Sequence, residues 1–232
     1  PLDDYRLVIA PTLYMVKPGV SDRLSAFTEQ GGTLVLSIYS GMADENDNVT
    51  QSGYPGELRK LCGLWIEEFD SLPSGECNHF TWDGQRYTSE LMFALSHPEG
   101  AQTLAGYETD FYQGMPVLSV HHTGKGQVYY FGTRSEKAFY HAFTKKLCTE
   151  QGLLSQDAKE VPEGLELSIR EKDGVNYLFF LNHLGEENHT ARENSICLTD
   201  QLAGTSMLSG RKYCGGETLT LPPYGVELLR QG

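Results

Sequence analysis

The sequence is poor in basic residues. Its 232 residues include 18 Lys and Arg against 31 Asp and Glu, which gives a formal net charge of -13 at pH 7. Two basic residues stand side by side only at 59–60, 145–146 and 211–212. Because proteins that bind nucleic acid or anionic membranes present a basic stripe to the phosphate groups, this scarcity argues against both kinds of partner.

Long apolar runs are also missing. No stretch approaches the ~20 apolar residues that cross a bilayer, and the opening PLDD lacks the basic and apolar segments of a signal peptide. These absences predict a soluble, cytoplasmic protein. The chain does not begin with Met, so we expect it to be a piece of a longer polypeptide.

Closely paired cysteines are absent as well. No two of the five cysteines form a C-x-x-C pair, and a disulfide framework or a zinc knuckle would need such spacings. Cys62 and Cys148 stand in apolar segments, where a free Cys packs like a small hydrophobic residue. We therefore predict five reduced, structural cysteines, namely Cys62, Cys77, Cys148, Cys197 and Cys214.

Motifs for catalysis are missing too. Glu67 and Glu68 are neighbours on an expected strand, so their carboxylates should point to opposite faces rather than across a cleft. The pair His121-His122 fails as a metal site for the same reason. The loop DEND at 44–47 lacks the spacing of a calcium loop, and YSG at 39–41 is no nucleophile elbow. We predict no catalytic, cofactor-binding or metal-binding residue in this chain.

The first part of the chain has the pattern of an α/β domain. The apolar run LVIA at 7–10 predicts a buried strand, and a helix start follows at 18–22. Gly31-Gly32 ends that helix before a second apolar strand at 33–38, so the segment is a β-α-β unit. Hairpins are expected at Asp83-Gly84 and around 123–126, and an amphipathic helix over 136–151.

The composition changes at 155–164, a polar stretch with Pro162 and Gly164. We interpret it as a linker between a domain at 1–154 and a domain at 165–232. Beyond it, short alternating segments are separated by Gly, Asn, Asp and Pro, which predicts a small all-β sandwich.

Several stretches resemble the C-terminal region of glycoside hydrolase family 42, the bacterial β-galactosidases. The resemblance covers nearly the whole chain in order. It is carried by LVIAPTLYMV at 7–16, SG at 40–41 with DEND at 44–47, GYPG at 53–56, WIEEFD at 65–70, GKGQVYYFGTR at 124–134, GLEL at 164–167, YLFFLNH at 177–183 and PYGV at 223–226.

The resemblance implies a function without catalysis in this chain. In that family a barrel domain carries two glutamates of a retaining mechanism, and no segment here corresponds to the barrel, so none of its catalytic residues is carried over. A flavodoxin-like, amidotransferase-like domain then holds the enzyme together as a trimer, and a small β-sandwich follows. Here the flavodoxin-like domain would lack its first β-α-β, so we expect another chain or preceding residues to cover the edge of its sheet.

The expected partners are therefore further copies of the chain in a homotrimer, and the catalytic barrel of the same protein. The galactoside substrate would bind mainly outside this chain. Met42, Tyr54 and Trp65 are the candidate interface residues, because aromatic and Met side chains anchor interfaces. Trp65 could equally be an ordinary core residue.

Two other functions stay open at this point. One is an independent amidotransferase-like enzyme with a thiol nucleophile, although no Cys follows either strand of the first β-α-β. The other is a carbohydrate-binding module in the C-terminal domain, with Tyr177, Tyr213 or Tyr224 as a platform. Of these, Tyr224 is expected to pack rather than to bind.

Overall fold

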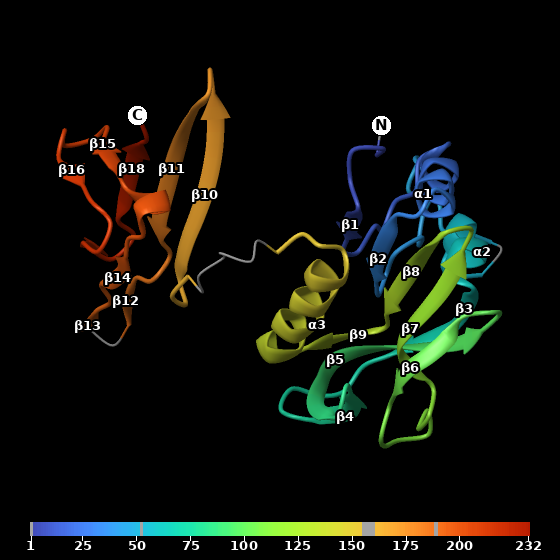
Figure 1. Cartoon of the computed structure of the whole chain (residues 1–232). Coiled ribbons are helices and arrows are strands. Elements are labelled where there is room, and N and C mark those ends of the chain that lie inside the picture. Colours follow the sequence, from blue (N-terminus) through green and yellow to red (C-terminus); the bar gives the residue numbers. More distant parts are fainter. Residues whose placement is uncertain (1, 52, 155–160, 188–189) are drawn as a thin grey trace. The chain divides into compact units, whose positions relative to one another are not determined.

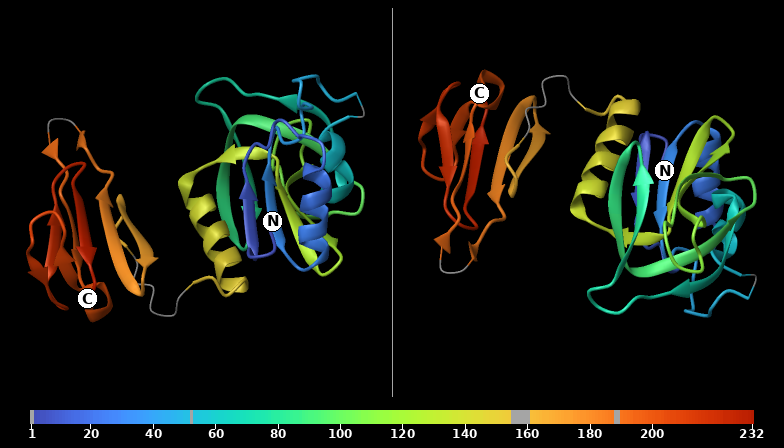
Figure 2. Two further views of the ribbon diagram at one scale, coloured as in Figure 1. Left: turned by 90° about the horizontal axis from the view of Figure 1, so that it is seen from above. Right: turned by 90° about the horizontal axis from the view of Figure 1, so that it is seen from below.

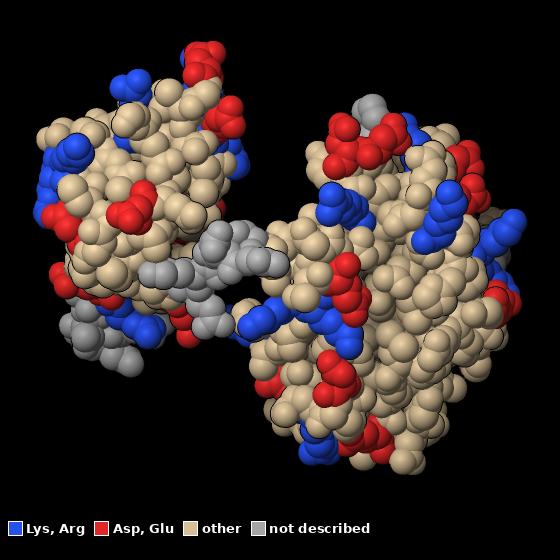
Figure 3. All heavy atoms as spheres, viewed as in Figure 1, with Lys and Arg blue, Asp and Glu red and all other residues tan. Residues whose placement is uncertain are grey.

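The computed structural model describes residues 2–51, 53–154, 161–187 and 190–232. The chain forms two compact units, Pro1–Ser155 and Gln156–Gly232 (Figure 1). Of the linker predicted at 155–164, residues 155–160 lie outside the described part. Acidic and basic side chains are interspersed on the faces of both units drawn in Figure 3. Within the described residues, no helix is long and apolar enough to cross a membrane.

The first unit is built on a mixed five-stranded sheet in the order β1-β2-β8-β7-β6. Strands β1 (Leu7–Ala10), β2 (Thr33–Ser37) and β8 (Gly126–Phe131) are parallel, whereas β7 (Pro116–Thr123) and β6 (Gln102–Gly106) are antiparallel to their neighbours. Helix α1 (Val20–Glu29) joins β1 to β2, so the predicted β-α-β unit is confirmed. So is the hairpin that joins β7 to β8. Strand β1 is one edge of this sheet, and Ile9 on it is 48% exposed.

Both faces of the parallel strands are covered. Leu34 and Leu36 pack with α1 in one buried cluster, whereas Val35 packs with α3 (Lys137–Glu150) in another. Figure 2 shows the two helices on opposite sides of the sheet. The alternation explains the unbroken apolar run of β2, since each successive side chain enters a different core.

A second sheet has the order β3-β5-β4, with β9 (Thr133–Ser135) also pairing with β5. The predicted hairpin at Asp83-Gly84 joins β4 (Cys77–Trp82) to β5. Strand β5 was expected to end near residue 89 but extends over Gln85–Pro98. Leu91 has a φ of 71° and the register shifts between Glu90 and Phe93, so the strand bends and continues beside β3 (Leu64–Asp70).

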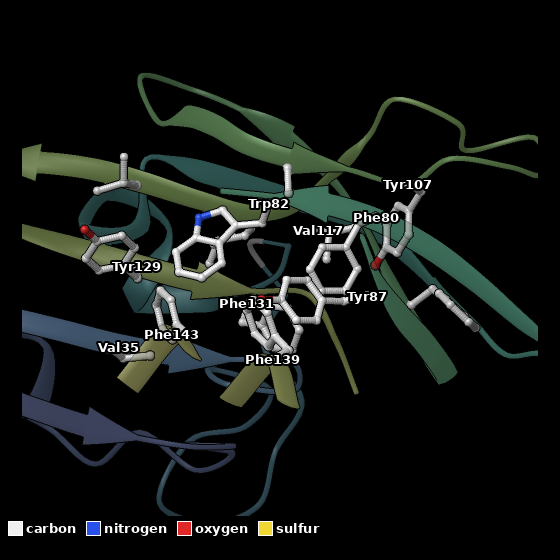
Figure 4. Close-up of a cluster of buried hydrophobic side chains, with 14 of the residues drawn as sticks. Val35, Phe80, Trp82, Tyr87, Tyr107, Val117, Tyr129, Phe131, Phe139 and Phe143 are labelled. Atoms are coloured by element: carbon white, nitrogen blue, oxygen red, sulfur yellow. The ribbon is translucent and has the colours of Figure 1, made fainter. Parts of the chain in front are cut away.

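Helix α3 closes the first unit and lies within the range predicted for it. Phe139, Phe143 and Leu147 are its buried residues. The Phe139 ring stacks on Phe131 with the centroids 4.6 Å apart and meets Phe80 edge to face at 5.1 Å. Figure 4 shows these rings, together with Trp82 and Tyr87, converging from the helix and both sheets. This aromatic cluster joins the two sheets of the unit.

The described part of the second unit contains strands and one short 3-10 helix, η2 (Asp200–Leu202), as the all-β prediction requires. Its larger sheet has the order β10-β11-β18-β15-β16, and β14 pairs with β17 in a smaller one. Both sheets supply the buried cluster, with Phe180 and Leu229 from the larger and Ile196 and Leu219 from the smaller. The strands are β10 (Leu165–Lys172), β11 (Val175–Asn182), β12 (Glu186–Glu187), β13 (Thr190–Ala191), β14 (Asn194–Cys197), β15 (Gly204–Ser206), β16 (Lys212–Tyr213), β17 (Thr218–Leu221) and β18 (Val226–Arg230).

Candidate subunit interface

The loop at 40–56 leaves strand β2 through a tight change of direction. Tyr39 and Gly41 both lie in the left-handed region, with φ of 64° and 71°. Ser40 between them is fully buried, and its hydroxyl oxygen accepts the Leu13 N–H at 3.1 Å. This hydroxyl therefore holds the chain in place, in agreement with the expectation that YSG is a strand exit rather than a nucleophile elbow.

Main-chain hydrogen bonds attach the loop to the rest of the unit. The Met42 N–H donates to the Tyr14 carbonyl at 2.9 Å, and the Met42 carbonyl accepts from Thr50 at 3.1 Å. The Met42 side chain is half-buried. Further along, the Ile66 N–H on β3 donates to the Tyr54 carbonyl at 2.9 Å. The loop is thus tied to two neighbouring segments by its backbone.

Asp44, the first carboxylate at the acidic tip of the loop, accepts hydrogen bonds from within the loop. Oδ1 of Asp44 accepts the N–H groups of Asn46 and Asn48 at 2.8 and 2.9 Å, and Oδ2 accepts from the Asn48 side chain at 3.1 Å. These hydrogen bonds, the one from the Asn48 side chain foremost, hold the pKa of the Asp44 carboxyl below its ordinary value. Within the described residues, no group of three or more His, Cys, Asp or Glu side chains is arranged to hold a metal.

A recess of about 450 Å³ opens beside this loop. Its walls combine apolar, amide and carboxylate groups, so it has no single chemical character. The lining residues are Val16, Gly41, Ala43, Asp44, Asn48, Val49, Thr50, Gln51, Gly56 and Glu57. None of the three predicted interface residues lines it.

Tyr54 and Trp65 lie on different faces of β3. Tyr54 forms a bridge with Ile66 and packs against the buried cluster that contains Ile66; its ring centroid lies 5.6 Å from that of Phe69. Trp65 precedes Ile66 on the strand, so its side chain points to the opposite face. The structure therefore brings the backbones of Tyr54 and β3 together while Tyr54 faces the core and Trp65 faces outward.

Trp65 is the centre of a stacked group of side chains. The His97 ring, directly opposite on β5, stacks on the indole with the centroids 4.6 Å apart and an interplanar angle of 17°. The Arg59 guanidinium, on the short helix α2 (Arg59–Cys62), lies 5.7 Å from the indole centroid. Trp65 itself is half-buried. An aromatic and a cationic neighbour therefore fix the orientation of the ring.

Carboxylates hold both of these neighbours. Glu99 accepts two hydrogen bonds from Arg59, including one from Nε at 2.7 Å, and Glu67 lies 2.8 Å from Nε2 of His97. The Arg59 guanidinium beside Glu99 holds the pKa of that carboxyl below its ordinary value. We call Arg59, Trp65, His97, Glu67 and Glu99 the Trp65 stack. The partners of Trp65 were not predicted from the sequence, because the strand that brings His97 opposite it was expected to end earlier.

The structure also shows where two pairs of neighbouring side chains point, one pair on β3 and one on β7. Glu67 and Glu68 were predicted to point to opposite faces, but a register shift between Ile66 and Glu68 breaks the alternation and both side chains are exposed. His121 is half-buried with Nδ1 2.9 Å from the Leu61 carbonyl, whereas His122 is exposed. The histidine pair therefore divides between the interior and the solvent, as predicted.

The cysteines are all free, but they do not share one environment. Cys62 is buried, and burial raises the pKa of its thiol above the usual range. Cys148 is half-buried, whereas Cys77, Cys197 and Cys214 are exposed. The expectation of five structural cysteines is therefore wrong for the last three, which lie on edge or surface segments where neighbouring side chains do not cover them.

Comparison with known proteins identifies the chain. Residues 1–154 match the family model described as the β-galactosidase trimerisation domain, and residues 164–231 match that of the β-galactosidase C-terminal domain. The chain belongs to the trimerisation-domain family of the glycoside hydrolase family 42 β-galactosidases. The order of the two matches agrees with the two units of the structure.

Relatives of known function carry this family-42 region as a small part of a longer chain. The β-galactosidase BgaP of Planococcus sp. strain L4 is 46% identical over 188 residues, which are 78% of this chain and 28% of the relative. The β-galactosidase BglY of Alicyclobacillus acidocaldarius is 44% identical over 193 residues, 80% of this chain and 28% of the relative. The chain thus spans less than a third of the length of these relatives.

Solved structures show the same relationship. The β-galactosidase of Bacillus circulans sp. alkalophilus superposes with a TM-score of 0.80 at 37% identity and covers 98% of this chain but 33% of its own. The β-galactosidase of Rahnella sp. R3 superposes with a TM-score of 0.79 at 33% identity. The superposed region is 99% of this chain and 33% of the Rahnella chain. The fold of the family-42 region is therefore a mixed-sheet unit followed by an all-β unit.

Proposed function

We propose that this chain is the assembly region of a β-galactosidase. A barrel domain elsewhere in the same polypeptide would hydrolyse terminal β-D-galactosides by a retaining mechanism with two glutamates. The observation that carries the proposal is the coverage. The matched domains, which are named for trimerisation and for the C-terminus, take up residues 1–154 and 164–231 of this chain. The aligned region is only 28% of the length of the first relatives. We also propose a cytoplasmic location, which the five free cysteines support because reduced thiols are typical of that compartment.

The activity test compares two lengths of the protein. The 232-residue chain is expected to release no chromophore from a chromogenic β-galactoside, whereas the polypeptide extended to the length of its relatives is expected to turn it over. Turnover by the short chain would overturn the proposal, because its acid, base and nucleophile would then have to lie within these 232 residues. So would the absence of turnover by the long one.

Self-association is the role proposed for the first unit, as a homotrimer whose interface includes Met42, Tyr54 and Trp65. The Trp65 stack supports this choice. A tryptophan held between His97 and Arg59 loses little rotational freedom on binding, and rigid, partly exposed aromatic and Arg side chains are the residue types that dominate interface energies. Tyr54 is proposed to support the interface from the core side of β3.

Light scattering on the extended polypeptide tests the interface. Trp65→Ala is expected to weaken the trimer by about 2 kcal/mol or more per contact, while Lys125→Ala, in the exposed turn after β7, serves as the matched control. Met42→Ala should have a smaller effect in the same direction. Since Tyr54 packs against the core, Tyr54→Ala is accompanied by a thermal melt to separate unfolding from dissociation. An unchanged trimer with Trp65→Ala would remove the Trp65 stack from the interface.

For the fold of this unit we propose a flavodoxin-like arrangement that lacks its first β-α-β in the 232-residue chain. The parallel order β1-β2-β8, with helices on both faces, supports it. The exposed edge of β1 would then pair with a further strand. Amide hydrogen exchange at β1 is expected to be slower in the extended polypeptide than in the 232-residue chain.

The two alternative functions have less support. The residue at the turn after β2 is Tyr39, and Cys62, the buried cysteine, has a raised pKa, which disfavours a thiolate nucleophile. A carbohydrate platform would need exposed rings, yet Tyr213 is buried and Tyr177 half-buried. Tyr224 is 73% exposed, contrary to the expected packing, although its hydroxyl leans over Gly185. Preferential labelling of one cysteine by iodoacetamide at neutral pH would favour the thiol enzyme.

A further inference from the structure

Strand β11 is apolar on both of its faces. Leu178 and Phe180 point into the buried core of the second unit, where they are 1% and 0% exposed. Tyr177, Phe179 and Leu181 alternate with them and point away from that core; all three are half-buried and none belongs to a buried cluster. A strand that is apolar on both faces is typical of a strand covered on both faces.

The strand register extends this surface onto β18. Phe179 lies opposite Leu228, and Leu181 lies opposite Val226, so these side chains share one face. Val226 is 50% exposed. We call Tyr177, Phe179, Leu181, Val226 and Leu228 the outer face. Next to it, Met207 donates its N–H to the Leu228 carbonyl at 2.8 Å and is 55% exposed, which continues the apolar surface toward the end of β15.

One end of the outer face is basic. The pairing places Arg170, Tyr177, Arg230, Thr205 and Lys212 opposite one another in a row that crosses all five strands. The guanidinium of Arg170 donates only to the neighbouring Ile169 carbonyl, and none of the three cations forms an ion pair with any residue that the structure describes. The chain has a net charge of -13, yet these three cations beside an apolar surface have no carboxylate partner among the described residues; such an edge would suit a surface that carries carboxylates.

We propose that the outer face is the docking surface for the part of the polypeptide that the β-galactosidase relatives carry beyond the matched region. It would present apolar side chains to Phe179 and Leu228 and carboxylates to Arg170 and Arg230. The inference rests on the proposed function, which places a catalytic domain in that part. The solved relatives are about three times as long as the matched region, so two thirds of their chain is available as the cover.

The chemistry of the outer face favours a polypeptide over a sugar. A sugar-binding platform combines an exposed ring with hydrogen-bonding groups around it. Phe179 has instead Leu228 on one side and Ser168 on the other. The next row holds Leu181 and Val226 with Glu166, whose carboxylate already lies 2.9 Å from Nε2 of His183. The trimerisation domain is matched to the first unit, not to this one. An apolar centre with a charged edge resembles the interface between domains of one chain.

The experiment compares the 232-residue chain with the polypeptide extended to the length of its relatives. Met207 reports directly on the cover, because its thioether is oxidised to the sulfoxide only where peroxide reaches it. We expect its oxidation by dilute hydrogen peroxide, measured by peptide mass spectrometry, to be at least about fivefold slower in the extended polypeptide. Equal rates in the two proteins would overturn the inference.

A charge placed on the outer face tests the same point by stability. Phe179→Glu is expected to lower the melting temperature of the extended polypeptide by ~4 °C or more and to leave that of the 232-residue chain within ~1 °C. Thr218→Glu, at an exposed position of β17 in the other sheet, is the control and should change neither melting temperature. An equal fall in the melting temperature of both proteins would mean that Phe179 supports its own unit. An unchanged melting temperature in both would mean that the outer face is open to solvent. Both outcomes contradict the docking surface.

These results are separable from the proposed function. Turnover of a β-galactoside by the extended polypeptide tests whether it carries a catalytic domain. Met207 protection and the response to Phe179→Glu need only the folded, extended polypeptide. An active enzyme with an unprotected Met207 would therefore retain the proposed function and reject the docking surface.

Discussion

At the scale of single residues, the loop at 40–56 depends on one close approach between two backbones. Gly41 has a φ of 71°, and a Cβ built on it would lie 2.0 Å from the carbonyl oxygen of Pro55. Backbone atoms cannot move aside as the end of a side chain can, so only glycine fits there. The contact fixes Pro55, and with it the neighbouring Tyr54, against the exit of β2.

We predict that Gly41→Ala destabilises the chain by about 2 kcal/mol or more, because it adds a backbone clash to the cost of the left-handed conformation. Gly53→Ala is the matched control: its φ is 81°, but its Cβ would meet only the end of the Arg59 side chain at 3.7 Å. It should cost about 1 kcal/mol. Urea denaturation followed by circular dichroism measures both, and equal losses would mean that the approach to Pro55 is not what selects glycine.

Glu108 provides a test that depends on pH. Arg86 Nε donates to it at 2.7 Å and the Thr81 hydroxyl at 2.9 Å, and the bond from Arg86 foremost holds the pKa of this carboxyl below its ordinary value. A lowered folded-state pKa stabilises the fold above the unfolded pKa of about 4.3, and that stabilisation is lost as the pH falls through the folded value.

We therefore predict that Glu108→Gln lowers the free energy of unfolding at pH 7 by no more than about 1 kcal/mol, since solvent screens this partly exposed pair. The difference from the unmodified chain should shrink as the pH falls below ~4. Urea titrations between pH 7 and pH 3 measure it. Glu76→Gln, in an exposed turn where the structure describes no ion pair, should show no such convergence; if it does, the effect is one of net charge.

At the scale of elements, α3 is held by its aromatic stripe rather than by caps. No side chain caps its N-terminus. Phe139 is fully buried and contacts rings from β4, β5 and β8. Because these strands belong to both sheets of the first unit (Figure 4), one side chain connects three layers.

Phe139→Ala is accordingly predicted to destabilise the first unit by about 3–5 kcal/mol, the range for removing a buried phenylalanine. Thr144→Ala on the exposed side of the same helix should change stability by less than about 0.5 kcal/mol. The measurement is the midpoint of guanidinium unfolding. A small loss at Phe139 would show that the surrounding rings can repack around the space.

The elements that the sequence predicts well are those specified by local signals. The β-α-β at 7–38 has two apolar runs and has glycines at both ends of the helix between them, and α3 has a clear periodic stripe. Strand β5 was predicted too short because its second half pairs with β3 across a bulge at Leu91, a nonlocal event without a local signal. The partners of Trp65 were missed for the same reason, since His97 meets it only through that pairing.

At the scale of the whole molecule, each unit has a buried core of its own. The clusters around Phe139 and around Leu36 lie in the first unit, and the cluster around Phe180 lies in the second. The two family matches, residues 1–154 and 164–231, follow the same division. Unfolding cooperativity comes from shared structure. The two clusters of the first unit lie on opposite faces of the same strands and are expected to melt together, whereas the cluster of the second unit is expected to melt as a separate transition.

Differential scanning calorimetry of the 232-residue chain should therefore resolve two transitions, the larger enthalpy belonging to the longer first unit because unfolding enthalpy scales with chain length. Phe180→Ala removes a fully buried ring from the second unit and is expected to reduce the unfolding free energy of that unit by about 3–5 kcal/mol. Only the midpoint temperature of the smaller transition should therefore fall. Phe139→Ala should lower only the larger. If either variant shifted both transitions together, the two cores would be coupled through contacts between the units. The division of the chain into an assembly unit and a separate docking unit would then fail.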